Sequence, residues 1–245
     1  MFFRNRGSNM SSRKQDARKA GALYLLLVVI GLLGLMYLPS FFIVRGDATA
    51  TARNILTSDL LYRTWVAVDL AGNILFVFVV LAVYQLLKEV NRAHATLMMV
   101  LALVSVPLSL VNTVAMTAPL VLLSGADFLA PLDQHQLEAL AYAFLRLRGQ
   151  GLVVASAFWG LWLLPFGLLI YRSGFIPRIL GVFLWAAGVG YLLDCLSTLL
   201  APDSTSAISS VCRVLEAGEL PIVFWLAIKG VRDQSSGGQA ASQAA

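Results

Sequence analysis

Residues 213–229 read Arg213-Val-Leu-Glu216-Ala-Gly-Glu219-Leu-Pro221-Ile-Val-Phe-Trp-Leu-Ala-Ile-Lys229. This stretch is apolar enough for a membrane helix but begins with three charged side chains. At a rise of 1.5 Å per residue, Glu219 would lie roughly 15 Å from Lys229, near the middle of a ~30 Å hydrocarbon core. An ionised group at that depth costs roughly 2.5–3.5 kcal/mol even on an insertion scale. We therefore expect Glu219 to face other helices of a bundle that supply its partners.

The composition of the whole chain is that of a membrane protein. Its 245 residues are 59% hydrophobic and 13% charged, and the mean hydropathy is +0.80. A soluble domain of this size needs more charge to cover its surface. Six of the 18 basic residues lie in the first 19 positions, directly before an apolar run. This placement is typical of a cytoplasmic anchor on anionic lipids, so we predict the lipid bilayer as a partner and no nucleic acid.

Six apolar runs predict an all-α, polytopic membrane fold with six transmembrane helices. The expected spans are about 20–44, 62–87, 95–123, 151–171, 179–200 and 208–228. Two amphipathic outer segments are expected to pack over the bundle. One covers about 48–60, as a surface helix or folded loop, and the other covers 133–145, where apolar residues recur with a helical period after an N-cap at Asp133. The membrane domain would cover 20–232, between a basic cytoplasmic tail at 1–19 and a disordered cytoplasmic tail at 233–245.

The distribution of basic residues predicts that both termini are cytoplasmic. With six spans, the inner side would carry 12 bases, which are Arg4, Arg6, Arg13, Lys14, Arg18, Lys19, Lys88, Arg92, Arg172, Arg178, Lys229 and Arg232. The outer side would carry 6, which are Arg45, Arg53, Arg63, Arg146, Arg148 and Arg213. This two-to-one ratio follows the positive-inside rule. The two halves show no convincing similarity, which argues mildly against a transporter built from inverted repeats.

Several short stretches together resemble a known family. They are Gly46-Asp47-Ala48, Asn54-Ile55, Leu61-Tyr62-Arg63, Tyr84-Gln-Leu86-Leu87, Tyr171-Arg-Ser-Gly-Phe-Ile-Pro-Arg-Ile-Leu-Gly181, Gly218-Glu219 and Trp225-Leu-Ala-Ile-Lys-Gly230. The set resembles the bacterial membrane-protein family named domain of unknown function 4386, over about residues 18–232, and the run 171–181 is its most specific part. The resemblance implies a six-span protein of the bacterial cytoplasmic membrane and brings no established activity.

The same depth count predicts a polar layer in the outer half of the bundle. Five residues fall roughly 20–28 Å from the inner face, which are Asp69, Asn73, Asp194, Arg213 and Glu216. Glu219 lies below them at the midplane, and Arg148 lies at the rim. We predict these seven residues as a ligand-binding site, an outward-facing acidic pocket for a small solute, a cation or a proton, because charges inside a membrane usually serve function. The alternative is a buried network of ion pairs, which on its own is weak evidence for function.

Enzyme and cofactor signatures are absent from the sequence. We find no G-x-S-x-G, H-E-x-x-H or Walker A motif and predict no catalytic residue. The two histidines, His94 and His135, and the spacing of Cys195 and Cys212 predict no metal site and no cofactor. The thiols are either free or joined in a disulfide. The sequence does not define an oligomeric state.

Two other functions stay open. One is a membrane-embedded enzyme that acts on a lipid or an extracytoplasmic substrate, with Glu219 and Asp194 as acid and base. The other is a structural accessory subunit of a membrane complex. Pro221, which removes a helical hydrogen bond beside Glu219, is either a hinge or a passive kink.

Overall fold

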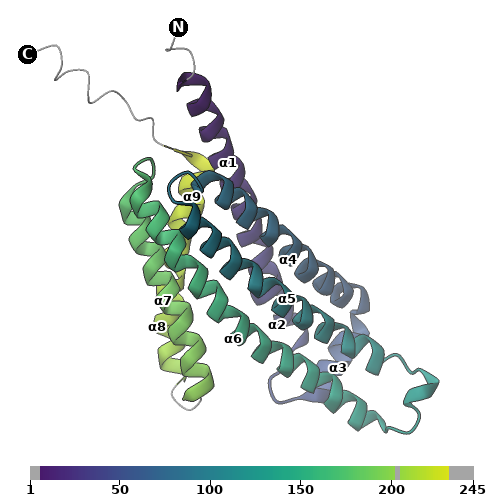
Figure 1. Ribbon diagram of the computed structural model, residues 1–245. Helices are drawn as coiled ribbons and strands as arrows, with labels where there is room; N and C mark the ends of the chain where they lie inside the picture. The colour runs from purple at the N-terminus through teal and green to yellow at the C-terminus, as the bar shows by residue number, and fades with distance from the viewer. Residues whose placement is uncertain (1–5, 202–204, 232–245) are drawn as a thin grey trace, which may run out of the picture.

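The computed structural model describes residues 6–201 and 205–231, and every regular element of this part of the chain is a helix (Figure 1). The predicted tail 233–245 lies outside the described residues. Residues 6–19 of the predicted basic tail continue the first span as one helix. The elements are α1 (Arg6–Gly31), the π-helix η1 (Leu32–Tyr37), α2 (Leu38–Phe42), α3 (Ala48–Thr57), α4 (Asp59–Leu87), α5 (Arg92–Leu122), η2 (Asp127–Leu129), α6 (Gln134–Ser173), α7 (Arg178–Leu200), α8 (Thr205–Glu216), η4 (Ala217–Glu219) and α9 (Leu220–Ile228).

Five helical segments are long and apolar enough to cross a membrane, so the chain is a multi-pass membrane protein. They are Arg13–Phe42, Asp59–Leu87, Arg92–Leu122, Gln134–Ser173 and Arg178–Leu200. The last apolar run, predicted as a sixth span, is helical but divided. It consists of 12 residues in α8, 3 residues of 3₁₀-helix in η4 and 9 residues in α9. No single piece reaches the ~20 residues that a spanning helix needs, so six spans are not established by helix length.

The outer segment 133–145 and the fourth span form one helix, α6, of 40 residues. The helix starts where the sequence predicts. Asp133 accepts a hydrogen bond from the Gln136 backbone at 2.9 Å, and the Gln136 side chain accepts one from the Asp133 backbone at 3.0 Å. This capping box satisfies two of the free donors at the helix start. The apolar period that begins after Asp133 continues into the span, so no separate surface helix forms.

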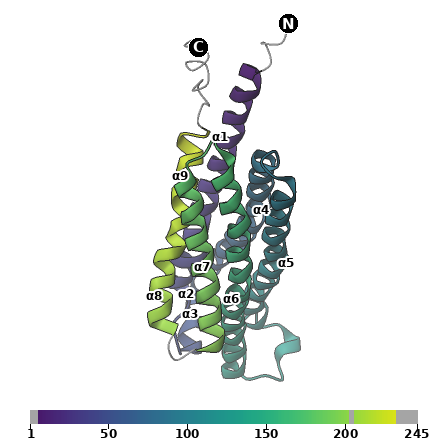
Figure 2. The ribbon, with the colours of Figure 1, turned by 60° about the vertical axis from the view of Figure 1, so that its left-hand side comes forward.

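The helices pack as a ring in which each contacts its neighbours. Helix α1 packs on α4, α4 on α5, α5 on α6, α6 on α7, and α7 on α8 and η4, while α9 returns to α1 (Figures 1 and 2). Gly21 permits the closing contact, because a Cβ at this position would lie 2.6 Å from the Cα of Ala227 in α9. Helices α6 and α7 approach closely in the same way, since a Cβ on Gly160 would lie 2.7 Å from the Gly188 carbonyl oxygen.

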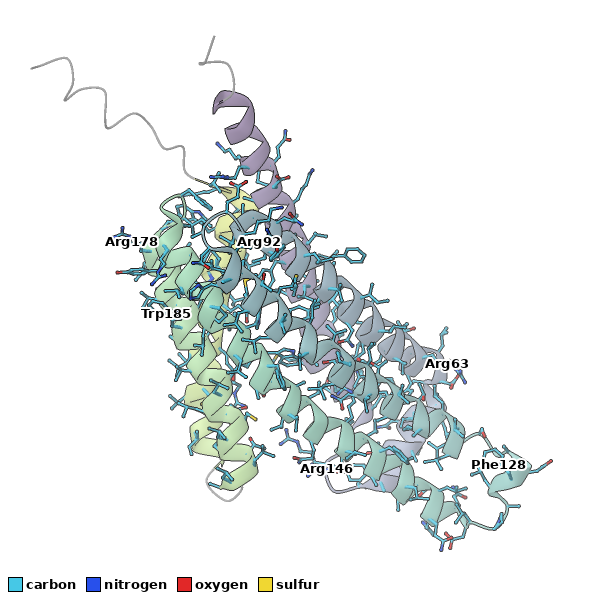
Figure 3. All side chains as sticks on the ribbon, viewed as in Figure 1. Arg63, Arg92, Phe128, Arg146, Arg178 and Trp185 are labelled. Carbon is cyan, nitrogen blue, oxygen red and sulfur yellow. The ribbon has the colours of Figure 1, made fainter. Side chains whose placement is uncertain are left out.

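The two ends of the bundle differ. Helix α1 begins and α9 ends at one end, which we name the terminal end, and Figure 3 places Arg92 and Arg178 there. Arg63 and Phe128 lie toward the opposite, distal end, where α3 packs on α6. Toward the distal end the α7–α8 pair diverges from α4, α5 and α6 (Figure 1). The ring is therefore closed around its terminal half and looser in its distal half.

Candidate functional site

The seven predicted site residues lie on two sides of the bundle. Asp69, Asn73 and Arg148 meet between α4, α5 and α6, whereas the other four lie on α7, α8 and η4. We name the first group the arginine cluster (Asp69, Asn73, Thr113 and Arg148) and define a second, the glutamate cluster (Tyr24, Tyr191, Glu216 and Glu219). The structure does not bring all seven residues together around one point.

The arginine cluster is a buried ion pair with a full set of hydrogen bonds on the carboxylate. Arg148 Nη2 donates to Asp69 Oδ1 at 2.8 Å, and the two side chains are 6% and 9% exposed. Thr113 Oγ1 donates to Asp69 Oδ2 at 2.5 Å. Asn73 Nδ2 lies 3.3 Å from both Asp69 Oδ2 and Thr113 Oγ1. A charge pair with this many partners is neutralised within the protein.

Trp65 joins the arginine cluster to the first helix. The Arg148 guanidinium lies 5.0 Å from the centre of the Trp65 ring, a cation–π contact. Trp65 Nε1 donates to the Gly34 carbonyl at 2.7 Å, inside the π-helix η1. A π-helix leaves backbone groups outside the α-helical pattern, so this indole bond satisfies one of them. The cluster therefore fixes three helices and one irregular turn.

The glutamate cluster has a different character, because its carboxylate has hydroxyl donors and no cation. Tyr24 on α1 donates a hydrogen bond to Glu219 Oε1, and Tyr191 on α7 donates to Glu219 Oε2 at 3.3 Å. Within the part of the chain that the structure describes, neither Glu219 nor Glu216 forms an ion pair. Two hydroxyl donors solvate a carboxylate but do not neutralise it.

A break in the last helix places Glu219. The chain changes from α8 to one 3₁₀ turn at Ala217–Glu219 and then to α9, with Pro221 in the first turn of α9. Gly218 lies against α7, where an added Cβ would be 2.8 Å from the Phe183 carbonyl oxygen. A 3₁₀ turn within a longer helix often marks a hinge or local strain. The helix is thus locally rewound at Glu219, directly before Pro221.

Asp194 and Arg213, also predicted site residues, lie beside the glutamate cluster and form no ion pair with each other. The Asp194 carboxylate accepts a hydrogen bond from Ser209 on α8. Arg213 is exposed, and its Nη2 donates to Ser210 Oγ at 3.2 Å. Cys195 and Cys212 are buried free thiols and are not joined in a disulfide.

Two surface pockets lie away from both clusters. One, of about 380 Å³, is lined by Thr49, Arg53, Leu56, Thr57, Gln134 and Glu138 between α3 and α6. Another, of about 230 Å³, lies along α9 and is lined by Pro221, Phe224, Trp225, Ile228 and Lys229. Neither contains a predicted site residue, so the outward-facing acidic pocket stays a prediction. Among residues 6–201 and 205–231, no three His, Cys, Asp or Glu side chains gather in a way that could hold a metal ion.

Three important residues were missed from the sequence. Tyr24, Tyr191 and Thr113 supply the hydroxyl groups that contact the two carboxylates. Threonine is common in membrane helices, and tyrosine in an apolar run normally predicts an interfacial position. The position of Tyr191 in the middle of the predicted span 179–200 was an available signal, whereas Tyr24 lies near the start of the predicted span 20–44 and gave none.

Comparison with known proteins identifies the family. The family model described as Domain of unknown function (DUF4386) matches residues 19–230. An uncharacterized protein of Archaeoglobus fulgidus is 36% identical over 73 residues, which is 30% of this chain and 42% of that protein. The chain therefore matches less than half the length of this relative, and no solved structure matches it. Since the family model covers most of the chain, the protein belongs to the DUF4386 family.

Proposed function

We propose that this protein binds a proton or another cation at Glu219, inside a six-span bundle whose termini are both cytoplasmic. The observation that carries the proposal is the pairing of the Glu219 carboxylate with two tyrosine hydroxyls and no cation among the described residues. Two observations support six spans with cytoplasmic termini. Basic residues are in excess near the terminal end, and the last apolar run stays helical from α8 through η4 into α9.

The argument depends on the contrast between the two clusters. Asp69 has Arg148 as a built-in countercharge, so its ion pair serves the fold. Glu219 is half-buried between α1, α7 and η4, where an unpaired ionised carboxylate is unfavourable. A bound proton or cation from outside the protein would remove that cost. In a membrane bundle, an unneutralised acid of this kind is a candidate for proton or cation coupling.

The neighbouring charges strengthen the attraction for a cation. Glu216 is half-buried one turn before Glu219, and Asp194 lies on the adjacent α7. The nearest base in the chain, Arg213, is exposed and hydrogen-bonded to Ser210. Three acids opposite one exposed base leave the interior of this side negative.

Infrared difference spectroscopy of the purified protein tests the proposal directly. We expect acidification to produce the C=O stretching band of a buried carboxylic acid, and we expect Glu219→Gln to lack this band. Glu138→Gln is the matched control, because Glu138 is also buried but lies at the distal α3–α6 contact, where Thr49 and Gln134 bond to it. If Glu219→Gln and the wild type give the same band and the same proton uptake, the proposal is wrong.

A flux assay extends the test to transport. The wild type and Glu219→Gln are reconstituted in vesicles with an internal pH dye, and a cation gradient is applied. Cation-driven proton movement in the wild type, lost in a folded Glu219→Gln variant, would assign transport to this carboxyl group. Binding without movement would assign a binding function alone.

A further inference from the structure

Each of the two tyrosines that donate to Glu219 is paired with a tryptophan, and we name the four side chains the aromatic frame (Tyr24, Trp159, Trp162 and Tyr191). The rings form two pairs. Tyr24 and Trp162 lie 6.1 Å apart at 41°, and Trp159 and Tyr191 lie 6.3 Å apart at 80°, edge to face. Each pair includes one of the tyrosines that donate to Glu219. Tyrosines of α1 and α7 thus contact a carboxylate on η4, and tryptophans of α6 pack against both tyrosines.

The aromatic frame has a closed side and an open side. Tyr24 and Trp162 are each 2% exposed, and Trp162 is packed further by Phe76 and Phe166. Trp159, Tyr191 and both glutamates are only half-buried. Tyr24 donates to Glu219 Oε1 on the closed side, whereas Tyr191 donates to Glu219 Oε2 on the open side at 3.3 Å. Glu219 Oε2 is therefore the oxygen that an incoming cation would meet.

The chemistry of these groups discriminates between kinds of cation. A small hard ion such as Ca²⁺ or Mg²⁺ takes six or more oxygen ligands. Here the side-chain oxygens of the glutamate cluster are those of two carboxylates and two phenols, and the tyrosines pack against two tryptophan rings. Aromatic faces attract a weakly hydrated organic cation electrostatically, and a carboxylate behind them supplies the countercharge. Apolar substituents on such a cation would also pack favourably against the apolar side chains of membrane helices.

We infer that the glutamate cluster and the aromatic frame together form a binding site for a lipophilic organic cation, such as a quaternary ammonium ion with apolar substituents. The inference rests on the proposed function, because it needs Glu219 as the cation-binding carboxylate. When Glu219 is protonated, binding exchanges one cation for one proton: the O–H bond of the carboxyl group breaks, the proton leaves to solvent, and the carboxylate pairs with the ammonium charge. The other charged groups that face this exchange are Glu216, Asp194 and Arg213.

Calorimetric titration of the full-length protein in detergent with benzyltrimethylammonium tests the inference, with protein-free micelles as the blank. Trp159→Leu removes a π face of the open side and should weaken binding by about 2- to 30-fold. The matched control is Trp185→Leu on α7, whose indole donates to the Leu164 carbonyl about 9 Å along the helix from Tyr191 (Figure 3). This control should keep the wild-type affinity. Proton release is measured by repeating the titration in buffers of different ionisation enthalpy, because the released proton is taken up by the buffer. Glu219→Gln should abolish both the binding and this proton release.

The outcomes separate this inference from the proposed function. If the Glu219-dependent infrared band is present but benzyltrimethylammonium does not bind, or binds equally to Trp159→Leu and Trp185→Leu, the organic-cation site is wrong and the proton site stands. If benzyltrimethylammonium binds Glu219→Gln as it binds the wild type, the inference is overturned as well. Should Trp159→Leu fail to fold, Trp159→Phe keeps a smaller π face and should show an intermediate loss of affinity.

Discussion

Replacing Arg148 by Met should strongly lower the free energy of unfolding. The substitution keeps a long apolar side chain but leaves the Asp69 carboxylate, 9% exposed, with only the neutral donors of Thr113 and Asn73. Removing one member of a buried ion pair costs about 3–5 kcal/mol. The lost contact with the Trp65 ring adds about 0.5–2 kcal/mol. The unfolding equilibrium constant should therefore rise by at least about a hundredfold.

The double variant Asp69→Asn/Arg148→Met separates the buried charge from the lost packing. Asparagine keeps hydrogen-bonding groups toward Thr113 and Asn73 but carries no charge. The double variant should consequently recover about 1–3 kcal/mol relative to Arg148→Met alone, a positive coupling between two contacting groups. Arg63→Met on α4 is the matched control. It breaks a 2.7 Å pair with Asp59 that is more than half exposed, and we expect no measurable change.

Equilibrium unfolding in mixed micelles, with increasing mole fraction of sodium dodecyl sulfate, measures these differences. Circular dichroism follows the helices, and tryptophan fluorescence follows the surroundings of the five tryptophans, Trp65 among them. A loss below about 1 kcal/mol for Arg148→Met, or strictly additive effects in the double variant, would refute the view that Asp69 and Arg148 form a structural pair.

Two further predictions follow from packing. Gly21→Leu should lower the unfolding midpoint strongly, because its Cβ would overlap the α9 backbone at Ala227, whereas Gly31→Leu has no atom within 4 Å of its Cβ and should leave the midpoint nearly unchanged. Equal effects of the two substitutions would contradict the α1–α9 contact. Cys195 and Cys212 should resist a membrane-impermeant maleimide in the folded protein and react after denaturation, and reduction should not change mobility on a gel, since both thiols are free and buried. A mobility shift on reduction would instead reveal a disulfide.

The existence of the helices was predictable from the sequence because hydrophobic length is a local property. Each apolar run is long enough to require a helix in a membrane, and the N-cap signal at Asp133 located the start of α6 correctly. The pairing of Asp59 with Arg63 also follows from spacing within one helix. The periodicity of apolar residues does not show whether two neighbouring helical segments form one continuous helix. Residues 133–145 and the fourth span have the same period, and nothing in that period separates two helices from one.

The arrangement of the site was only partly predictable, for a geometric reason. Counting residues from the inner face gives the height of a side chain but not its direction around the bundle. Asp69 and Asp194 have similar heights, yet they lie on helices that do not adjoin in the ring. The partners of Glu219 come from positions 195 and 28 residues earlier in the chain, a separation at which one sequence carries no pairing signal. Height therefore predicted a single layer where the structure has two separate groups.

The π-helix at Leu32–Tyr37 also has a consequence for the length of the first span. A π turn closes each hydrogen bond over one more residue than an α turn, so η1 holds the equivalent of a single-residue insertion in the first span. Removing one residue there would restore an α-helix and rotate the distal part of the span, including α2, relative to Tyr24. Such a one-residue deletion would retain the Tyr24–Glu219 contact yet present a different edge of the first span to Trp65. The length of this segment thus sets the orientation of the distal half of the first span independently of the glutamate cluster.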